Sequence, residues 1–222
     1  MLILLLVGVL FIVLAPQWWV KHTLKKYAQP ADRYASSGAE LARHLLDEAG
    51  LQAVVVEQTL VGDHYDPIAK AVRLSELCHG GRSLTAITVA AHEVGHAIQD
   101  AQNHSLLRLR TRFAPLVMRS NQVAMVLLIA APIVAIASRS AILMWALVAI
   151  SIAVQAMAAL LHLITLPVEI DASFGRALPQ LKRLGILHES DYPHARRLLL
   201  AASATYLSAS LFSLLVLLRW IR

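Results

Sequence analysis

The sequence predicts a mainly α-helical membrane protein, with about four transmembrane helices and a small α+β region on the cytoplasmic side. Composition is the first reason, because 58% of the 222 residues are hydrophobic and the mean hydropathy is +0.61. Those values are too apolar for an ordinary soluble domain. The second reason is a set of four apolar runs, each near the ~20 residues that cross a bilayer. The runs are Leu2–Val20, Gln122–Ala137, Ala141–Val168 and Leu198–Leu218.

The placement of the basic residues is the third reason. The net charge is +6, and most of the cations lie beside the apolar runs: Lys21, Lys25, Lys26, Arg108, Arg110, Arg112, Arg119, Arg176, Lys182, Arg183, Arg196 and Arg197. By the positive-inside rule, residues 21–118 and 169–197 are expected to be cytoplasmic, with both termini outside. Basic patches interleaved with aromatic residues are absent, so the charge favours a lipid bilayer and not nucleic acid as partner.

The first run is expected to be a retained anchor at residues 1–20. It lacks the basic start and the small-residue cleavage site of a secretory signal. Trp18 and Trp19 close it, as aromatic residues do at a bilayer interface. The single cysteine, Cys78, excludes an internal disulfide and fits a reducing compartment.

The cytoplasmic region at 21–118 is expected to fold as helix, strand, turn, strand and helix. Ser37–Ala49 predicts a helix, with Ser36 or Ser37 as N-cap and Glu40 close behind. The β-branched stretches Ala53–Glu57 and Ala71–Leu74 predict strands, with a turn at Asp63–Pro67 between them. After the last helix, Ser105–Ser120 alternates apolar residues with four arginines and suits the inner leaflet.

The most informative stretch is Thr85–Gln102, which contains His92-Glu93-Val94-Gly95-His96 and predicts a helix. His92 and His96 then lie one turn apart on one face, within reach of one ion, and Glu93 lies beside it. This is the spacing of zinc hydrolases. A buried amphipathic helix with two satisfied histidines is the alternative, but unpartnered polar groups are costly in such an apolar setting. Gly95 indicates that space is needed beside the ion.

Catalytic zinc needs a third protein ligand, and Glu169 is the candidate. It follows Pro167, which is expected to end the third run. Two membrane crossings separate the motif from Glu169, so both are expected on one membrane face. The alternative for Glu169 is an interfacial carboxylate that pairs with an arginine. Asp171 is a candidate partner for a ligand histidine, because such carboxylates commonly orient metal-bound imidazoles.

The sequence leaves the roles of several other polar residues open. The donor that stabilises the developing oxyanion is expected among Tyr206, His194, Arg196 and Arg197. His162, inside the third run, is interpreted as a histidine satisfied within the helical bundle. The polar residues Asp63, His64 and Asp66 suit a turn better than a second metal site.

Several stretches together resemble the YugP-like family of bacterial membrane zinc metallopeptidases. They are DHYDP at 63–67, VRLSE at 72–76, AAHEVGHAIQDA at 90–101, LPVEIDAS at 166–173 and ATYLSA at 204–209. The resemblance implies zinc bound by His92, His96 and Glu169, a catalytic Glu93, and a multi-pass location in the bacterial inner membrane. The chain also resembles, distantly, the HtpX and CAAX-prenyl protease gluzincins. Those enzymes usually have Asp four residues after the ligand Glu, where this chain has Ser173.

The sequence therefore predicts a membrane-embedded, zinc-dependent metalloendopeptidase with a zincin-like cytoplasmic region. Glu93 is expected to act as general base and then acid on peptides or membrane proteins near the cytoplasmic face. An edge strand beside the metal is expected to hold the substrate as an added strand. A zinc-binding scaffold or chaperone-like protein without proteolytic activity is the alternative, although binding alone has no use for Glu93. A transporter is disfavoured, since the runs carry few ionisable residues. Substrate identity and oligomeric state stay open.

Overall fold

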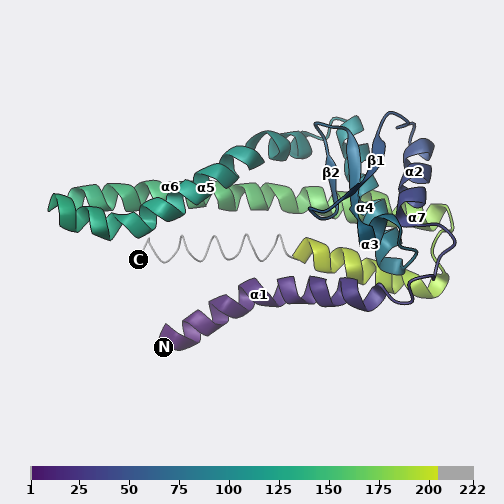
Figure 1. Ribbon diagram of the computed structural model, residues 1–222, viewed down its shortest axis with the longest axis horizontal. Coiled ribbons are helices and arrows are strands. Elements are labelled where there is room, and N and C mark those ends of the chain that lie inside the picture. The colour runs from purple at the N-terminus through teal and green to yellow at the C-terminus, as the bar shows by residue number, and fades with distance from the viewer. Residues whose placement is uncertain (1, 205–222) are drawn as a thin grey trace.

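The structure is a computed structural model that describes residues 2–204, without the side chains of 2–10, 12 and 13. Long helices extend from a compact α+β region at one end of the molecule (Figure 1). The long helices are α1 (Leu2–Tyr27), α5 (Ser105–Ser138), α6 (Ala141–Ile170) and a helix over 192–204.

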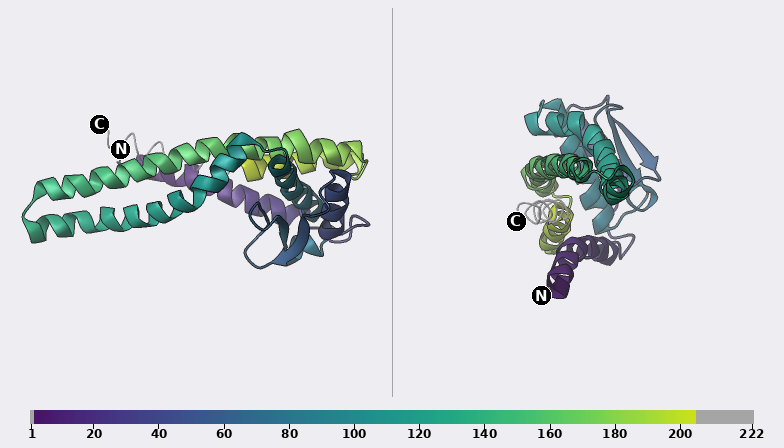
Figure 2. Two further views of the ribbon diagram at one scale, coloured as in Figure 1. Left: turned by 90° about the horizontal axis from the view of Figure 1, so that it is seen from above. Right: turned by 90° about the vertical axis from the view of Figure 1, so that its left-hand side faces the viewer.

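Helices α5 and α6 form an antiparallel hairpin and lie side by side in both views of Figure 2. Within the described residues, two helices are long and apolar enough to cross a membrane, Ser105–Ser138 and Ala141–Arg183. The first predicted run lies in α1, and most of the fourth lies outside the described residues. Four membrane spans therefore stay a prediction. The arginine-rich stretch 105–120 continues into the second run as one helix, α5.

The small sheet has the strand order β1-β3-β2, with β1 at Val55–Thr59, β2 at His64–Asp66 and β3 at Ala71–Ser75. β1 is parallel to β3 and β2 is antiparallel to it, so β2 forms one edge. The prediction of a turn at Asp63–Pro67 is wrong for the three central residues, because His64–Asp66 pair with β3 as a strand. Asp63 instead accepts hydrogen bonds from the Ser75 amide and hydroxyl, which fixes β2 against the end of β3.

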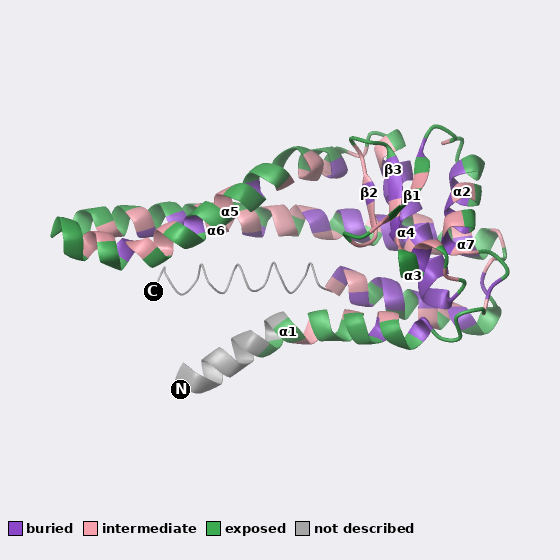
Figure 3. Ribbon diagram, in the orientation of Figure 1, coloured by how far each residue is buried: buried purple, intermediate pink, exposed green. Residues whose placement is uncertain are grey.

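The helices of this region are α2 (Gly38–Glu48), the short α3 (Glu76–His79) and α4 (Leu84–Ala101). Ser37 caps α2 through a complete capping box with Glu40, as predicted. α4 lies at the centre of the compact region and packs against α2, β3 and the chain after α6 (Figure 3). Its apolar face contributes Ile87 and Val94 to the core, which also holds Leu45, Leu46, Leu74 and Leu181.

Pro167, which is expected to end the third apolar run, lies inside a helix that continues beyond it. α6 continues to Ile170, then as a π-helix, η1 (Asp171–Ala177), and as α7 (Leu178–Arg183). A proline inside a helix costs one backbone hydrogen bond. Packing of η1 against α4 outweighs that loss, because Ala172 and Ala177 are fully buried there.

Gly95 allows the close approach of α4 and η1. A Cβ atom added to Gly95 would lie 2.6 Å from the Ala172 carbonyl oxygen. The sequence indicates that something needs the space beside Gly95, and the structure identifies the occupant as the backbone of η1. This contact brings the end of α6 up to the two histidines.

Candidate metal centre

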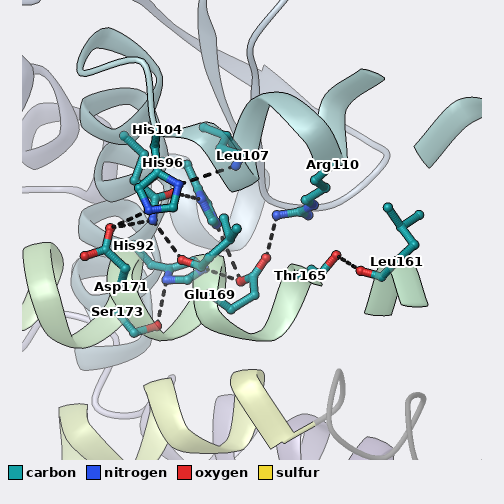
Figure 4. Close-up of polar contacts among 12 residues, drawn as sticks. His92, His96, His104, Leu107, Arg110, Leu161, Thr165, Glu169, Asp171 and Ser173 are labelled. Carbon is teal, nitrogen blue, oxygen red and sulfur yellow. Dashed lines mark hydrogen bonds and ion pairs between the residues drawn. The ribbon is translucent and has the colours of Figure 1, made fainter. Parts of the chain in front are cut away.

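His92, His96 and Glu169 meet in the interior, although 77 residues separate His92 from Glu169. One potential ligand atom from each lies within 4.8 Å of the others, and all three residues are buried. Glu169 Oε2 is 3.1 Å from His92 Nε2 and 3.5 Å from His96 Nε2 (Figure 4). The fold thus brings together the three residues that the sequence proposes as ligands.

Gln99 determines which ring nitrogen of His96 carries a proton. The Gln99 side-chain amide donates to the Val168 carbonyl at 2.8 Å and to Asp171 Oδ2 at 2.7 Å. Its Oε1 therefore faces His96 Nδ1, at 2.9 Å. An amide oxygen can only accept, so Nδ1 carries the proton and donates it.

This tautomer tests whether the site fits a metal. In the neutral ring, His96 Nε2 presents a lone pair to Glu169 Oε2, which is also an acceptor. Two acceptors 3.5 Å apart attract each other only through a cation between them, either a proton or a metal ion. Two imidazoles and one carboxylate form a ligand set that suits zinc. The residues present therefore fit the ion.

Ser173 and Asp171 lie at different distances from the ligand histidines. Ser173 Oγ lies 3.0 Å from His92 Nδ1, so it contacts a ligand histidine directly. Asp171 instead contacts Gln99 and accepts from Arg176 Nε at 2.8 Å. The partnership predicted between Asp171 and a ligand histidine therefore runs through Gln99, which the sequence analysis missed.

Glu93 lies in the same buried region as the ligands, 7% exposed. Burial raises the pKa of Glu93 to about 7, with the charges of Glu169 and Asp63 adding to the rise and His92 opposing it. A carboxyl group with a pKa near neutrality can both accept and return a proton.

A cleft of about 260 Å³ opens onto Glu93 and the three candidate ligands. One wall is the edge strand β2 with its flanking residues, from Asp63 to Ile68, and the other is the start of α5, from Leu107 to Pro115. Arg110 is the cation of this cleft, and its Nη1 donates to Glu169 Oε1 at 2.7 Å. The cleft is thus bounded by a strand edge and by the helix that leads into the second apolar run.

Three of the residues predicted as oxyanion donors, His194, Arg196 and Arg197, are not among the residues that line this cleft. His194 lies beside Tyr27, whose hydroxyl is 3.0 Å from His194 Nδ1. Arg196 lines a separate apolar groove, and Tyr206 lies outside the described residues. His162 is partly buried on α6 and is not among the residues that line the cleft.

Comparison with known proteins agrees with the predicted resemblance. The family described as "Putative neutral zinc metallopeptidase" matches residues 2–222, so the chain belongs to that family. The chain is also 37% identical over 207 residues to the Bacillus subtilis (strain 168) protein named "Putative membrane protease YugP". That match covers 92% of this chain and 88% of the relative. No solved structure matches the chain.

Proposed function

We propose that the protein is a membrane-embedded zinc metalloendopeptidase whose ligands are His92, His96 and Glu169. The observation that carries the proposal is the pairing of acceptor atoms, because Nε2 of His96 and Oε2 of Glu169 face each other in a buried site. Membership of the zinc metallopeptidase family supports it.

When bound, zinc would polarise the substrate carbonyl and make a neighbouring water more acidic. As the oxygen of that water attacks the carbonyl carbon, Glu93 accepts a proton from the water. Glu93 then gives the proton to the leaving amine as the peptide C–N bond breaks. Gln99 and Ser173 hold the two imidazoles through Nδ1, which keeps each Nε2 directed at the ion.

Edge strand β2 is the proposed binding site for the substrate backbone. One edge of β2 pairs with β3, and His64 and Tyr65 of β2 line the cleft. An extended peptide can add to the other edge as a further strand, which places a carbonyl over the ligands.

The cleft is proposed to face the cytoplasm of a bacterial cell, in a multi-pass protein with four spans and both termini outside. The arginines at the start of α5 support this orientation by the positive-inside rule. Substrates would then be membrane proteins, or peptides near the inner leaflet.

The substitution Glu93→Gln tests this function. The variant should retain zinc and lose about 100-fold or more of the hydrolysis of casein or a membrane peptide. Glu76→Gln, at an exposed carboxylate on α3, is the matched control and should keep the parent rate. A Glu93→Gln protein that cleaves at the parent rate contradicts the proposed role. A parent protein that binds zinc and cleaves no membrane peptide would favour the non-proteolytic scaffold.

A further inference from the structure

Apolar side chains project from the two chain segments that flank β2. Leu60 and Val61, between β1 and β2, are 97% and 89% exposed, and Ile68, between β2 and β3, is 85% exposed. These are the three most exposed large hydrophobic side chains in the described part of the chain. Singly exposed apolar residues are common on protein surfaces, so the significance of these three depends on what lies beside them.

These segments lie beside the start of α5, the helix that leads into the second apolar run. Ile68 lines the cleft opposite Leu107 to Pro115 of α5, and Asp63 at the end of the other segment lines it too. The same part of α5 carries exposed Arg108 and Arg112, and no acidic residue occurs in Ser105–Ser138. Arginines just before an apolar span lie among the lipid headgroups and favour anionic lipid.

We propose that the segments at 60–63 and 67–70 insert their apolar side chains into the bilayer surface beside α5. The α+β region then has a lateral contact with the lipid in addition to its covalent link through the long helices. Resting on the proposed function, this contact makes the cleft open along the membrane surface. The substrate would present its cleaved segment at headgroup depth, next to its own membrane anchor.

Labelling of one introduced cysteine at a time tests the lipid contact on the full-length protein. Cys78 is 2% exposed, and burial raises the pKa of its thiol to about 12, so it should not react with a thiol-directed probe at neutral pH. Leu60→Cys and Ile68→Cys proteins carry an NBD fluorophore in nanodiscs that contain phosphatidylglycerol. Gln52→Cys, at an exposed position outside both segments, is the control.

NBD at positions 60 and 68 should emit at shorter wavelength than at position 52 and be quenched several-fold more by doxyl-labelled lipid. Water-like emission at both positions would overturn the proposal. A blue shift without lipid quenching would also overturn it, because the contact would then be with protein. Zinc content and hydrolysis, measured on the same samples, report separately on the proposed function.

A second inference concerns the two oxygens of Glu169, which have different partners. Oε2 faces the imidazoles, whereas Oε1 accepts the hydrogen bond from Arg110. The side chain of Glu169 is only 4% exposed and that of Arg110 is 27% exposed, so this charge-assisted contact is partly shielded from water and costly to break.

We infer that Arg110 is a positioning residue that restricts Glu169 to one metal-binding oxygen. A carboxylate with both oxygens available can bind a cation through both. With Oε1 held by Arg110, Glu169 would offer Oε2 alone to a zinc ion, in keeping with a catalytic site that has three protein ligands and an open position.

Cobalt(II) substitution tests this role, since four-coordinate cobalt absorbs visible light more strongly than five-coordinate cobalt. Arg110→Ala should weaken the visible absorption several-fold and raise the zinc dissociation constant about 10-fold. Arg110→Lys should restore much of both, and Arg108→Ala is the control that should change neither. An Arg110→Ala protein with weaker zinc binding but the parent cobalt spectrum would overturn the inference, because general destabilisation produces that pattern.

Discussion

The helix α4 and the α5–α6 hairpin are both apolar, yet they bury their residues to very different extents. α4 buries 15 of its 18 residues, and α5 buries 4 of its 34 (Figure 3). Protein covers most of α4, whereas Ile129 and Ile136 of α5 are 68% and 80% exposed. Hydrophobicity alone therefore does not distinguish a core helix from one that suits lipid.

The two regions also differ in their polar residues. α4 carries two histidines, a glutamate and a glutamine, and the contacts of His92 and Gln99 reach residues more than 60 positions away. In α5, residues 123–137 contain no polar side chain. A polar group inside protein must find a partner, while a helix in lipid avoids having one. Packing and pairing should therefore dominate substitution effects in the compact region and matter less in the hairpin.

Gly95→Ala should have the largest effect, because the added methyl meets the Ala172 backbone at 2.6 Å. Backbone atoms cannot rotate away, so α4 and η1 must separate, at a cost of about 3 kcal/mol or more. Ala137→Val, an added bulk at an exposed position in the hairpin, should cost less than about 0.5 kcal/mol. Thermal unfolding in detergent compares the two variants. Equal losses of unfolding free energy would show that packing matters as much in the hairpin as in the compact region.

Glu169→Ala should have the next largest effect, measured as bound zinc per chain. Binding free energies of about 10–16 kcal/mol are shared among the ligands of a structural zinc site, so losing one ligand should cost on the order of 3 kcal/mol. Zinc should then be lost on dialysis. Glu189→Ala, outside the site, should retain the parent stoichiometry. Unchanged zinc in Glu169→Ala would remove this residue from the site.

Gln99→Ala should weaken zinc binding about 10- to 100-fold, because His96 Nδ1 loses its acceptor and the ring is free to change tautomer. Gln99→Glu should also bind zinc more weakly than the parent, because a carboxylate keeps an acceptor for Nδ1 but cannot donate to the Val168 carbonyl and repels Asp171. Competition with a chromophoric chelator measures both constants. Equal affinity in Gln99→Ala and the parent protein would show that the hydrogen bond does not orient the imidazole.

Whether a feature could be predicted from the sequence depends on how far apart along the chain the interacting residues lie. Spacing within one helix is local, so the sequence predicts the histidine face of α4 and the cap of α2. Glu169 was predicted from an expected pair of membrane crossings, and in the structure the α5–α6 hairpin returns the chain to the motif. Gln99 was missed, although it lies one turn after His96, because its acceptors lie 69 and 72 residues away. The strand β2 was missed for the same reason. Its residues are typical of a turn, and only their pairing with β3 makes His64–Asp66 a strand.

The smallest contrast concerns two serine N-caps. Ser37 accepts from the Glu40 amide at 3.2 Å, and the Glu40 carboxylate accepts from the Ser37 amide at 2.7 Å. Ser140 caps α6 in the hairpin through a single bond of 3.4 Å from the Leu143 amide, and the leucine side chain cannot return a hydrogen bond. Ser37→Ala should therefore cost about 1 kcal/mol, and Ser140→Ala less than about 0.5 kcal/mol. The two variants control for each other in one unfolding experiment. A larger loss at Ser140 would mean that the hairpin depends on local hydrogen bonds as strongly as the compact region does.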